Sequence, residues 1–140
     1  MKKMWFIIAV VMAMSCLNSP VQAQTSPVTE IKPGTKVEVY YFHFTRRCET
    51  CKAVEANSKK AVEELYSDKI KSGDYLFQGI NLDDEGSEKI AEKLGIGGQT
   101  LLVVCGEKKE DITDKGFLNS GDLEKMKQII QTAVDKVSRN

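Results

Sequence analysis

Two cysteines stand three residues apart at the start of a helical pattern, in the stretch TRRCETCKAVE. They are Cys48 and Cys51, and Arg46 and Arg47 come directly before them. A thiol in the first turn of a helix meets unpaired backbone N–H groups and the positive end of the helix dipole, and both favour the thiolate. The arginines add to this field, so we expect the pKa of Cys48 to fall from about 8.5 into the range of about 3.5–7.5. Cys51, one turn later on the same side, can close back onto Cys48. The pattern predicts thiol–disulfide exchange, with Cys48 as nucleophile and Cys51 as resolving thiol.

The N-terminal segment has the pattern of a secretory signal peptide. Lys2 and Lys3 precede WFIIAVVMAM, an apolar run of ten residues, and a small-residue site follows at Val21-Gln22-Ala23. The run is about half of the roughly 20 residues that span a bilayer, which disfavours a membrane anchor. We therefore expect cleavage after Ala23, a signal peptide over residues 1–23, and a periplasmic or secreted protein.

The number of cysteines left after cleavage excludes one class of protein. Cys16 leaves with the signal peptide; it raises the alternative of a lipoprotein, but its context AMSC fits a lipobox poorly, and we favour plain cleavage. The remaining Cys48, Cys51 and Cys105 are an odd number. The mature chain is therefore not a fully paired disulfide scaffold, and one thiol is left over whichever pair forms.

The composition of the mature chain indicates one ordinary domain. Removing 23 of the 140 residues leaves 117, enough for a single modest core. Because the two signal lysines are lost, 18 basic residues face 20 acidic ones, a net charge of about −2 without a basic block. This balance argues against nucleic acid or an anionic membrane as partner.

The hydrophobic pattern predicts four strands and three helices after a flexible lead-in over residues 24–34. The strands are expected at 36–44, 75–82, 100–105 and 110–113, and the helices from the second cysteine to about 67, at 86–94 and at about 120–138. The first half needs crossover helices and parallel pairing, whereas the turn at 106–109 needs an antiparallel hairpin. We predict an α/β domain over residues 35–140, with a mixed four-stranded sheet and helices on both faces.

This arrangement resembles the thioredoxin superfamily. A strand that ends in CxxC at a helix start, then INLDDEGSEKIAEKLGI, then TLLVV and a hairpin carry the resemblance, which covers nearly the whole mature chain. The stretch YYFHFTRRCETC also resembles a small family of exported thioredoxin-like proteins named after a nitrophenyl-compound nitroreductase subunit. The resemblance implies a thioredoxin-like fold and a redox-active Cys48–Cys51 pair. The family name is no evidence that nitro compounds are bound or reduced.

The sequence departs from the superfamily pattern in three places. Glu49-Thr50 replaces the usual Gly-Pro between the cysteines, and Glu49 partly opposes the arginines. The proline that normally precedes the third core strand in cis is absent, and Gln99 in GGQT stands nearest to its position. The buried acid that relatives carry on the first strand has no match, because Glu38 lies too early.

Two further residues have both a functional and a structural interpretation. His43 could relay a proton from Cys51, since its unperturbed pKa near 6.5 suits that role, but we favour a strand-end histidine that packs or meets solvent. Cys105 could be a third redox thiol, but a strand-end cysteine more often behaves as a small buried hydrophobe. In this topology the end of TLLVVC points away from CxxC. The Tyr40-Tyr41-Phe42 run is expected in the core.

The leading interpretation is a monomeric thiol–disulfide oxidoreductase that needs no cofactor and acts on a thiol- or disulfide-bearing protein partner. A second class is a soft-metal module in which Cys48, Cys51 and His43 hold copper(I); a closed zinc site wants four ligands, so we predict no bound zinc. A third class is a binding domain with a static Cys48–Cys51 disulfide, an alternative that gains weight from the absent proline.

Overall fold

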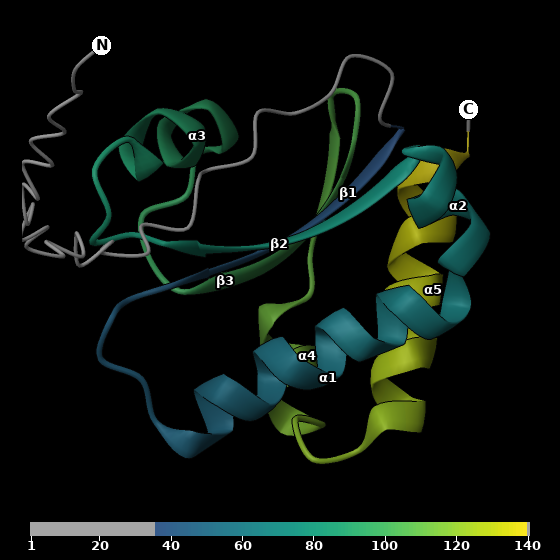
Figure 1. Ribbon diagram of the computed structural model, residues 1–140, viewed down its shortest axis with the longest axis horizontal. Coiled ribbons are helices and arrows are strands. Elements are labelled where there is room, and N and C mark those ends of the chain that lie inside the picture. The colour runs from purple at the N-terminus through teal and green to yellow at the C-terminus, as the bar shows by residue number, and fades with distance from the viewer. Residues whose placement is uncertain (1–35, 140) are drawn as a thin grey trace, which may run out of the picture.

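The computed structural model describes residues 36–139, which form a mixed four-stranded sheet covered by helices on both faces (Figure 1). The strand order is β2-β1-β3-β4. The central strand β1 pairs in parallel with β2 and antiparallel with β3, and β3 pairs antiparallel with β4. The strands are β1 (Val37–His43), β2 (Tyr75–Asn81), β3 (Thr100–Cys105) and β4 (Lys108–Asp111). This is the predicted thioredoxin-like sheet. The predicted signal peptide and lead-in lie outside the described residues.

The helices divide unequally between the two faces of the sheet. One face carries α1 (Glu49–Leu65), α4 (Thr113–Leu118) and α5 (Leu123–Ser138), and α3 (Ser87–Leu94) lies on the other (Figure 1). The short helix α2 (Ser67–Ser72) follows α1 and contacts β2. No helix among residues 36–139 is long and apolar enough to cross a membrane.

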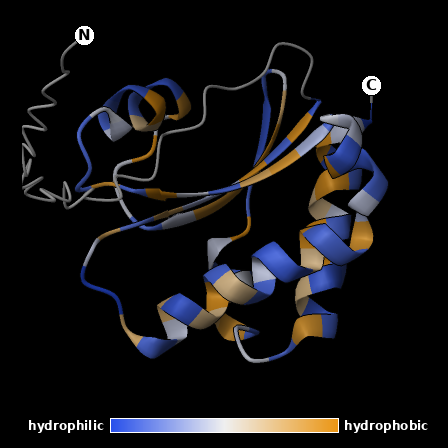
Figure 2. Cartoon of the chain, viewed as in Figure 1, coloured by the Kyte–Doolittle hydropathy of each residue, from blue (hydrophilic) through white to orange (hydrophobic). Residues whose placement is uncertain are grey.

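Alternation along the central strand builds two apolar layers. Successive side chains of a strand point to opposite faces, so Val39 and Tyr41 enter the layer under α1 and α5, whereas Tyr40 and Phe42 enter the layer under α3. All four are buried, which confirms the prediction of a central strand covered on both sides. In Figure 2 apolar residues recur along β2, α1 and α5 between hydrophilic ones.

The helix predicted at about 120–138 is α5, and its apolar positions form one buried face. Met126, Ile130 and Ala133 of α5 are buried, as are Val134 and Val137. Its cap is Asp122, whose carboxylate accepts the backbone N–H of Lys125 at 3.0 Å. Gly95 ends α3 in the left-handed region at φ 70°, as predicted for a helix stop.

One strand boundary differs from the prediction, and two short helices are additional. The fourth strand begins at Lys108, two residues earlier than predicted, because Gly106 adopts φ 61° and lets a two-residue turn bring Lys108 opposite Cys105. The helices α2 and α4 were not predicted. Each has only six residues, too short to display a helical repeat of apolar positions.

Candidate active site

The cysteine pair forms a disulfide at the N-terminus of α1. Cys48 is the cap residue of this helix, and its sulfur accepts the backbone N–H of Cys51 at 3.2 Å. Cys48 is exposed, whereas Cys51 has only 8% of its surface exposed. The sulfur that a partner can reach is therefore also the one that receives a helix N–H group. In the reduced protein that N–H would stabilise a Cys48 thiolate.

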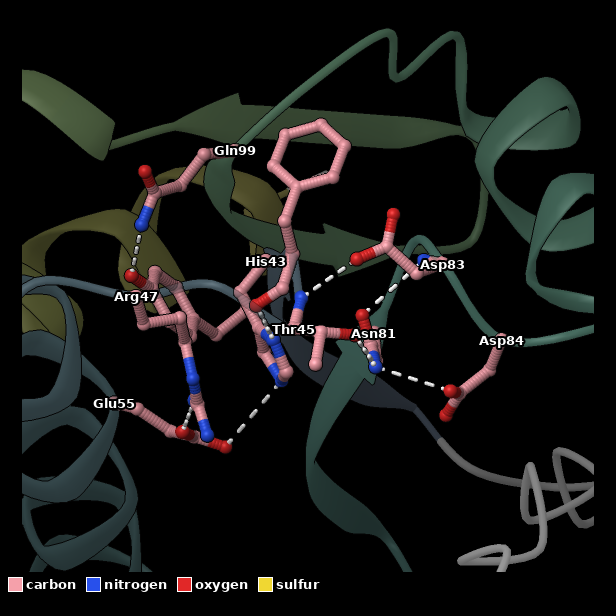
Figure 3. Close-up of polar contacts among 10 residues, drawn as sticks. His43, Thr45, Arg47, Glu55, Asn81, Asp83, Asp84 and Gln99 are labelled. Carbon is pink, nitrogen blue, oxygen red and sulfur yellow. Dashed lines mark hydrogen bonds and ion pairs between the residues drawn. The ribbon is translucent and has the colours of Figure 1, made fainter.

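The loop that leads to Cys48 is tied to the end of β2. The Thr45 N–H donates to Asp83 Oδ2 at 2.8 Å, and Asn81 Nδ2 donates to Thr45 Oγ1 at 2.9 Å (Figure 3). The Leu82 N–H donates to the carbonyl of His43 at 2.6 Å. The hydrogen bond from the Thr45 backbone lowers the pKa of Asp83. These contacts hold the approach to the cysteines, and the sequence analysis assigned no role to the residues that make them.

The two arginines lie in different surroundings. Arg46 is exposed and makes no ion pair with the described part of the chain, residues 36–139. Arg47 is half-buried, and its guanidinium is hydrogen-bonded to the Glu55 carboxylate (Figure 3). Because a paired charge produces a weaker field than a free one, Arg47 contributes less to the potential at Cys48 than its position in the sequence suggests.

Helix α1 also supplies a carboxylate, that of Glu55, which lies next to His43 and Arg47. Glu55 Oε1 lies 3.9 Å from His43 Nε2, and the carboxylate fills the space over Gly79, where a side chain would overlap it. On the first strand, where the sequence offers no match for the buried acid of relatives, Glu38 accepts the hydroxyl of Tyr40 at 3.0 Å. The spacing from Cys51 to Glu55 is four residues, which places both on one side of the helix and was the available signal.

His43 is buried at the end of β1. Its Nδ1–H donates to the carbonyl of Phe44 at 3.0 Å, and its ring centre lies 5.8 Å from that of Tyr41. Since the carbonyl of Phe44 can only accept, the proton of the neutral ring lies on Nδ1, and Nε2 faces Glu55. The packing role favoured from the sequence agrees with this burial.

Gln99 joins the cysteine pair to the central strand. Its Nε2 donates to the hydroxyl of Tyr41 at 2.5 Å, and its Oε1 lies 4.0 Å from Cys51 Sγ. No peptide bond within residues 36–139 is cis, so Gln99 occupies the approach to β3 without the cis-proline geometry. The sequence analysis placed Gln99 near the thiols by resemblance but gave Tyr41 no part in the site beyond core packing.

The residues between the cysteines are solvent-facing. Glu49 and Thr50 are exposed, and Glu49 Oε1 accepts the Lys52 ammonium at 2.8 Å. That hydrogen bond lowers the pKa of Glu49. Since Lys52 balances the charge, Glu49 opposes the positive field at Cys48 less than an unpaired carboxylate would.

The third cysteine of the described chain lies far from the pair. Cys105 is a free, half-buried thiol at the end of β3, opposite Lys108 of β4. In the antiparallel pairing, Thr100 at the start of β3 faces Phe42 near the site, and Val104 faces Glu38 at the other end of β1. The Cys105 thiol is therefore at the far end of the sheet.

No three His, Cys, Asp or Glu side chains within residues 36–139 converge as a metal-ligand set. The polar contacts of His43 run to Phe44 and Glu55. The sulfurs of Cys48 and Cys51 are bonded to each other. In this oxidised state they offer no thiolate to an ion.

The chain resembles solved structures at low sequence identity, among them the following two. A structure described as that of a malarial protein has a TM-score of 0.45 and 19% sequence identity, over 71% of this chain and 99% of that one. Thioredoxin from Wuchereria bancrofti has a TM-score of 0.36 and 15% identity, over 72% of this chain and 84% of that one. No family model matches the chain, and no curated protein sequence matches it. The thioredoxin-like assignment rests on the strand order and on the place of the cysteine pair.

Proposed function

We propose that the protein is an exported thiol–disulfide oxidoreductase that exchanges with a protein partner through Cys48 and Cys51. The observation that carries this proposal is the asymmetry of the pair. Cys48 is exposed and its sulfur accepts a helix N–H, whereas Cys51 is buried behind it. Export is supported by the leader over residues 1–23, and the stretch YYFHFTRRCETC supports membership of the small exported thioredoxin-like family that it resembles.

The proposed reaction has two steps. The Cys48 thiolate attacks one sulfur of a partner disulfide, which forms a mixed disulfide and releases the other partner sulfur as a thiolate. Cys51 then loses its proton to water and attacks the Cys48 sulfur, which expels the second partner thiolate. The partner gains two electrons and Cys48–Cys51 loses two. The reverse sequence oxidises a partner dithiol, and the reduction potential of the pair, measured against glutathione, assigns the direction.

The surface beside the pair supports a protein partner, and we propose that the chain meets this partner as a monomer. An apolar groove of about 400 Å³ is lined by Phe44, Leu82, Ala91 and Ile96, with Glu88 and Glu92 among its walls. It lies between the loop that leads to Cys48 and the loop that leads to Gln99. Phe44 is one of the few large apolar side chains of the described chain that is exposed. Apolar surface of this kind suits a polypeptide better than a small thiol.

Trapping of mixed disulfides tests the proposal. Cys51→Ala should accumulate covalent complexes with partner proteins in an extracytoplasmic extract, and reductant should release them, because the second thiol is missing. Cys48→Ala should trap far fewer, since Cys51 is buried. The matched control is Cys105→Ala, which removes the distant thiol and should behave like the wild type.

Two outcomes would contradict this assignment. Equal trapping by the Cys48 and Cys51 variants would mean that the roles drawn from exposure are wrong. No trapping by any variant, together with a wild-type disulfide that resists glutathione, would leave a binding domain with a static disulfide.

A further inference from the structure

The buried sulfur of the pair has one polar side-chain neighbour within residues 36–139, the amide of Gln99. Cys51 Sγ lies 4.0 Å from Gln99 Oε1. In the disulfide this sulfur carries no proton, so the contact is only a van der Waals contact. When the pair is reduced, Cys51 gains an S–H group, and the Gln99 amide oxygen is then an acceptor next to it, besides the Cys48 sulfur.

The same amide is anchored to a second buried residue, Tyr41. Gln99 Nε2 donates to the Tyr41 hydroxyl at 2.5 Å, which leaves Oε1 as the end that faces Cys51. Burial raises the pKa of Tyr41, although the hydrogen bond from Gln99 opposes this effect, so the hydroxyl stays neutral at physiological pH. A flipped amide would place its N–H groups against Cys51, and its oxygen would then accept the Tyr41 hydroxyl, because a hydroxyl can donate as well as accept.

We propose that Gln99 holds the proton on reduced Cys51 by accepting its S–H group, and that Tyr41 is the positioning residue that keeps the amide beside the sulfur. The proposal deepens the exchange function given above and rests on it for its biological meaning. The two cysteines would then favour different protonation states. The helix N–H favours the thiolate at Cys48, and the amide oxygen favours the thiol at Cys51.

The charged groups around Tyr41 and Cys51 do not replace this contact. Glu55 and Arg47 both act on Tyr41, but they are paired with each other. His43 directs its Nδ1–H to a backbone carbonyl and its Nε2 toward Glu55 at 3.9 Å. Cys48, the remaining ionisable neighbour, would repel a second thiolate when it is itself ionised.

The contact has a defined effect on the second step of exchange. Cys51 attacks Cys48 only after its proton has left for water, so a hydrogen bond that retains the proton lengthens the life of the mixed disulfide. Neither Gln99 nor the neutral Tyr41 takes the proton. Gln99 therefore sets the lifetime of the mixed disulfide between Cys48 and the partner.

The test measures the ionisation of Cys51 alone, without any partner. In a Cys48→Ala, Cys105→Ala background, Cys51 is the one remaining thiol of the mature chain, and its thiolate is followed by ultraviolet absorbance and by alkylation against pH. Gln99→Met keeps the length of the side chain but removes the strong acceptor, so ionisation should move to lower pH. At a fixed pH below the midpoint, the thiolate fraction should rise by about threefold to tenfold.

Two more variants separate the hydrogen bond from a change in packing. Tyr41→Phe should shift the midpoint in the same direction as Gln99→Met, because the amide then loses the hydrogen bond that holds it beside the sulfur. Gln99→Glu should shift it the other way, since a carboxylate disfavours a neighbouring thiolate. The matched control is Tyr40→Phe, which removes a hydroxyl from the same strand on the other face of the sheet and should have no effect.

A midpoint that stays at its original pH in both Gln99→Met and Tyr41→Phe would overturn the proposal. The result is independent of the trapping experiment. A shifted midpoint without trapped partners would support the hydrogen bond and contradict the exchange function, whereas trapped partners without a shift would contradict only the role of Gln99.

Discussion

The corner that carries the cysteine pair and the layer beneath α1 and α5 are held together by different forces. The corner joins segments distant in sequence through polar contacts: Thr45 to Asp83, Arg47 to Glu55 and Gln99 to Tyr41. The layer, to which the ring of Tyr41 also belongs, is almost wholly apolar, and Leu101, Met126 and Ile130 in it are fully buried. Burial of apolar surface contributes most to stability, whereas a partly exposed polar contact contributes little. The layer should therefore determine whether the protein folds, and the corner should determine how the thiols react.

The largest expected effect on stability comes from the layer. Met126→Ala should lower the free energy of unfolding by about 2–5 kcal/mol, because it leaves a cavity in a fully buried site. The value should lie in the upper part of that range, since the hydroxyl of buried Ser58 lies 3.5 Å from the Met126 sulfur and would lose this neighbour. Urea unfolding of the oxidised protein measures the change.

The same variant also tests the separation of the two regions. Ile129→Ala is the matched control, because Ile129 lies on the same helix but is only partly buried. It should lower the free energy of unfolding by less than Met126→Ala does. At a temperature where both variants are folded, the pH profile of Cys48 alkylation in reduced protein should match that of the wild type. A profile displaced by Met126→Ala would mean that the layer and the corner are coupled.

Much of the layer could be predicted from sequence, and much of the corner could not. The repeat of apolar residues along α5 and the near-continuous apolar run of β1 depend on neighbours within one segment, so the pattern indicated both elements. The cysteines were recognised because their spacing is local. The partners Asp83 and Tyr41 lie on other segments, and nothing in their immediate sequence marks them.

Glu55 shows that a residue close to the cysteines in sequence can also escape prediction. It is close in sequence to the cysteines, yet it resembles any charged residue on an exposed helix face until Gly79 is known to leave room for its carboxylate. The two short helices were missed for a related reason. A six-residue segment owes its helical form to the surfaces it packs on rather than to its own periodicity.

A smaller effect, confined to reactivity, is expected from the ion pair of the corner. Glu55→Gln leaves the Arg47 charge without its partner, so the thiolate of reduced Cys48 should be favoured and alkylation at mildly acidic pH should become faster, by about twofold to fivefold. The change in unfolding free energy should stay within about 1 kcal/mol, because both side chains are partly exposed. Replacing Arg46 and Arg47 together with glutamine should slow alkylation and move its profile to higher pH.

The control for the ion pair is Glu63→Gln, which removes a carboxylate from the same helix but at its other end, where Glu63 lies 3.9 Å from Lys59. It should leave the alkylation profile unchanged. If the Glu55 and Glu63 variants accelerate alkylation equally, the net charge of the chain rather than the Arg47 pair sets the field at Cys48.

The smallest effect is expected where the loop meets the end of β2. The backbone N–H of Thr45 donates to Asp83 and lowers the pKa of this carboxyl in the folded protein. The contribution to stability is thus present above the unfolded pKa of about 3.9 and is lost as the pH falls through the lower, folded value. Since Asp83 is exposed, the loss should appear as loosening of the loop and not as global unfolding.

Nuclear magnetic resonance can follow this local event. The Thr45 amide signal of the wild type should move with a midpoint below about 3.9, and in Asp83→Asn this titration should be absent. The neighbouring Asp84 accepts from Asn81 at 3.0 Å and not from Thr45, so Asp84→Asn is the matched control and should retain the titration. Asp83→Asn should also leave the unfolding free energy near neutral pH almost unchanged, because the amide oxygen of asparagine can still accept the Thr45 N–H. A Thr45 signal that titrates identically in both variants would show that the loop is held by its other contacts, the Asn81 side chain and the carbonyl of His43, and that the carboxylate of Asp83 is not part of the corner.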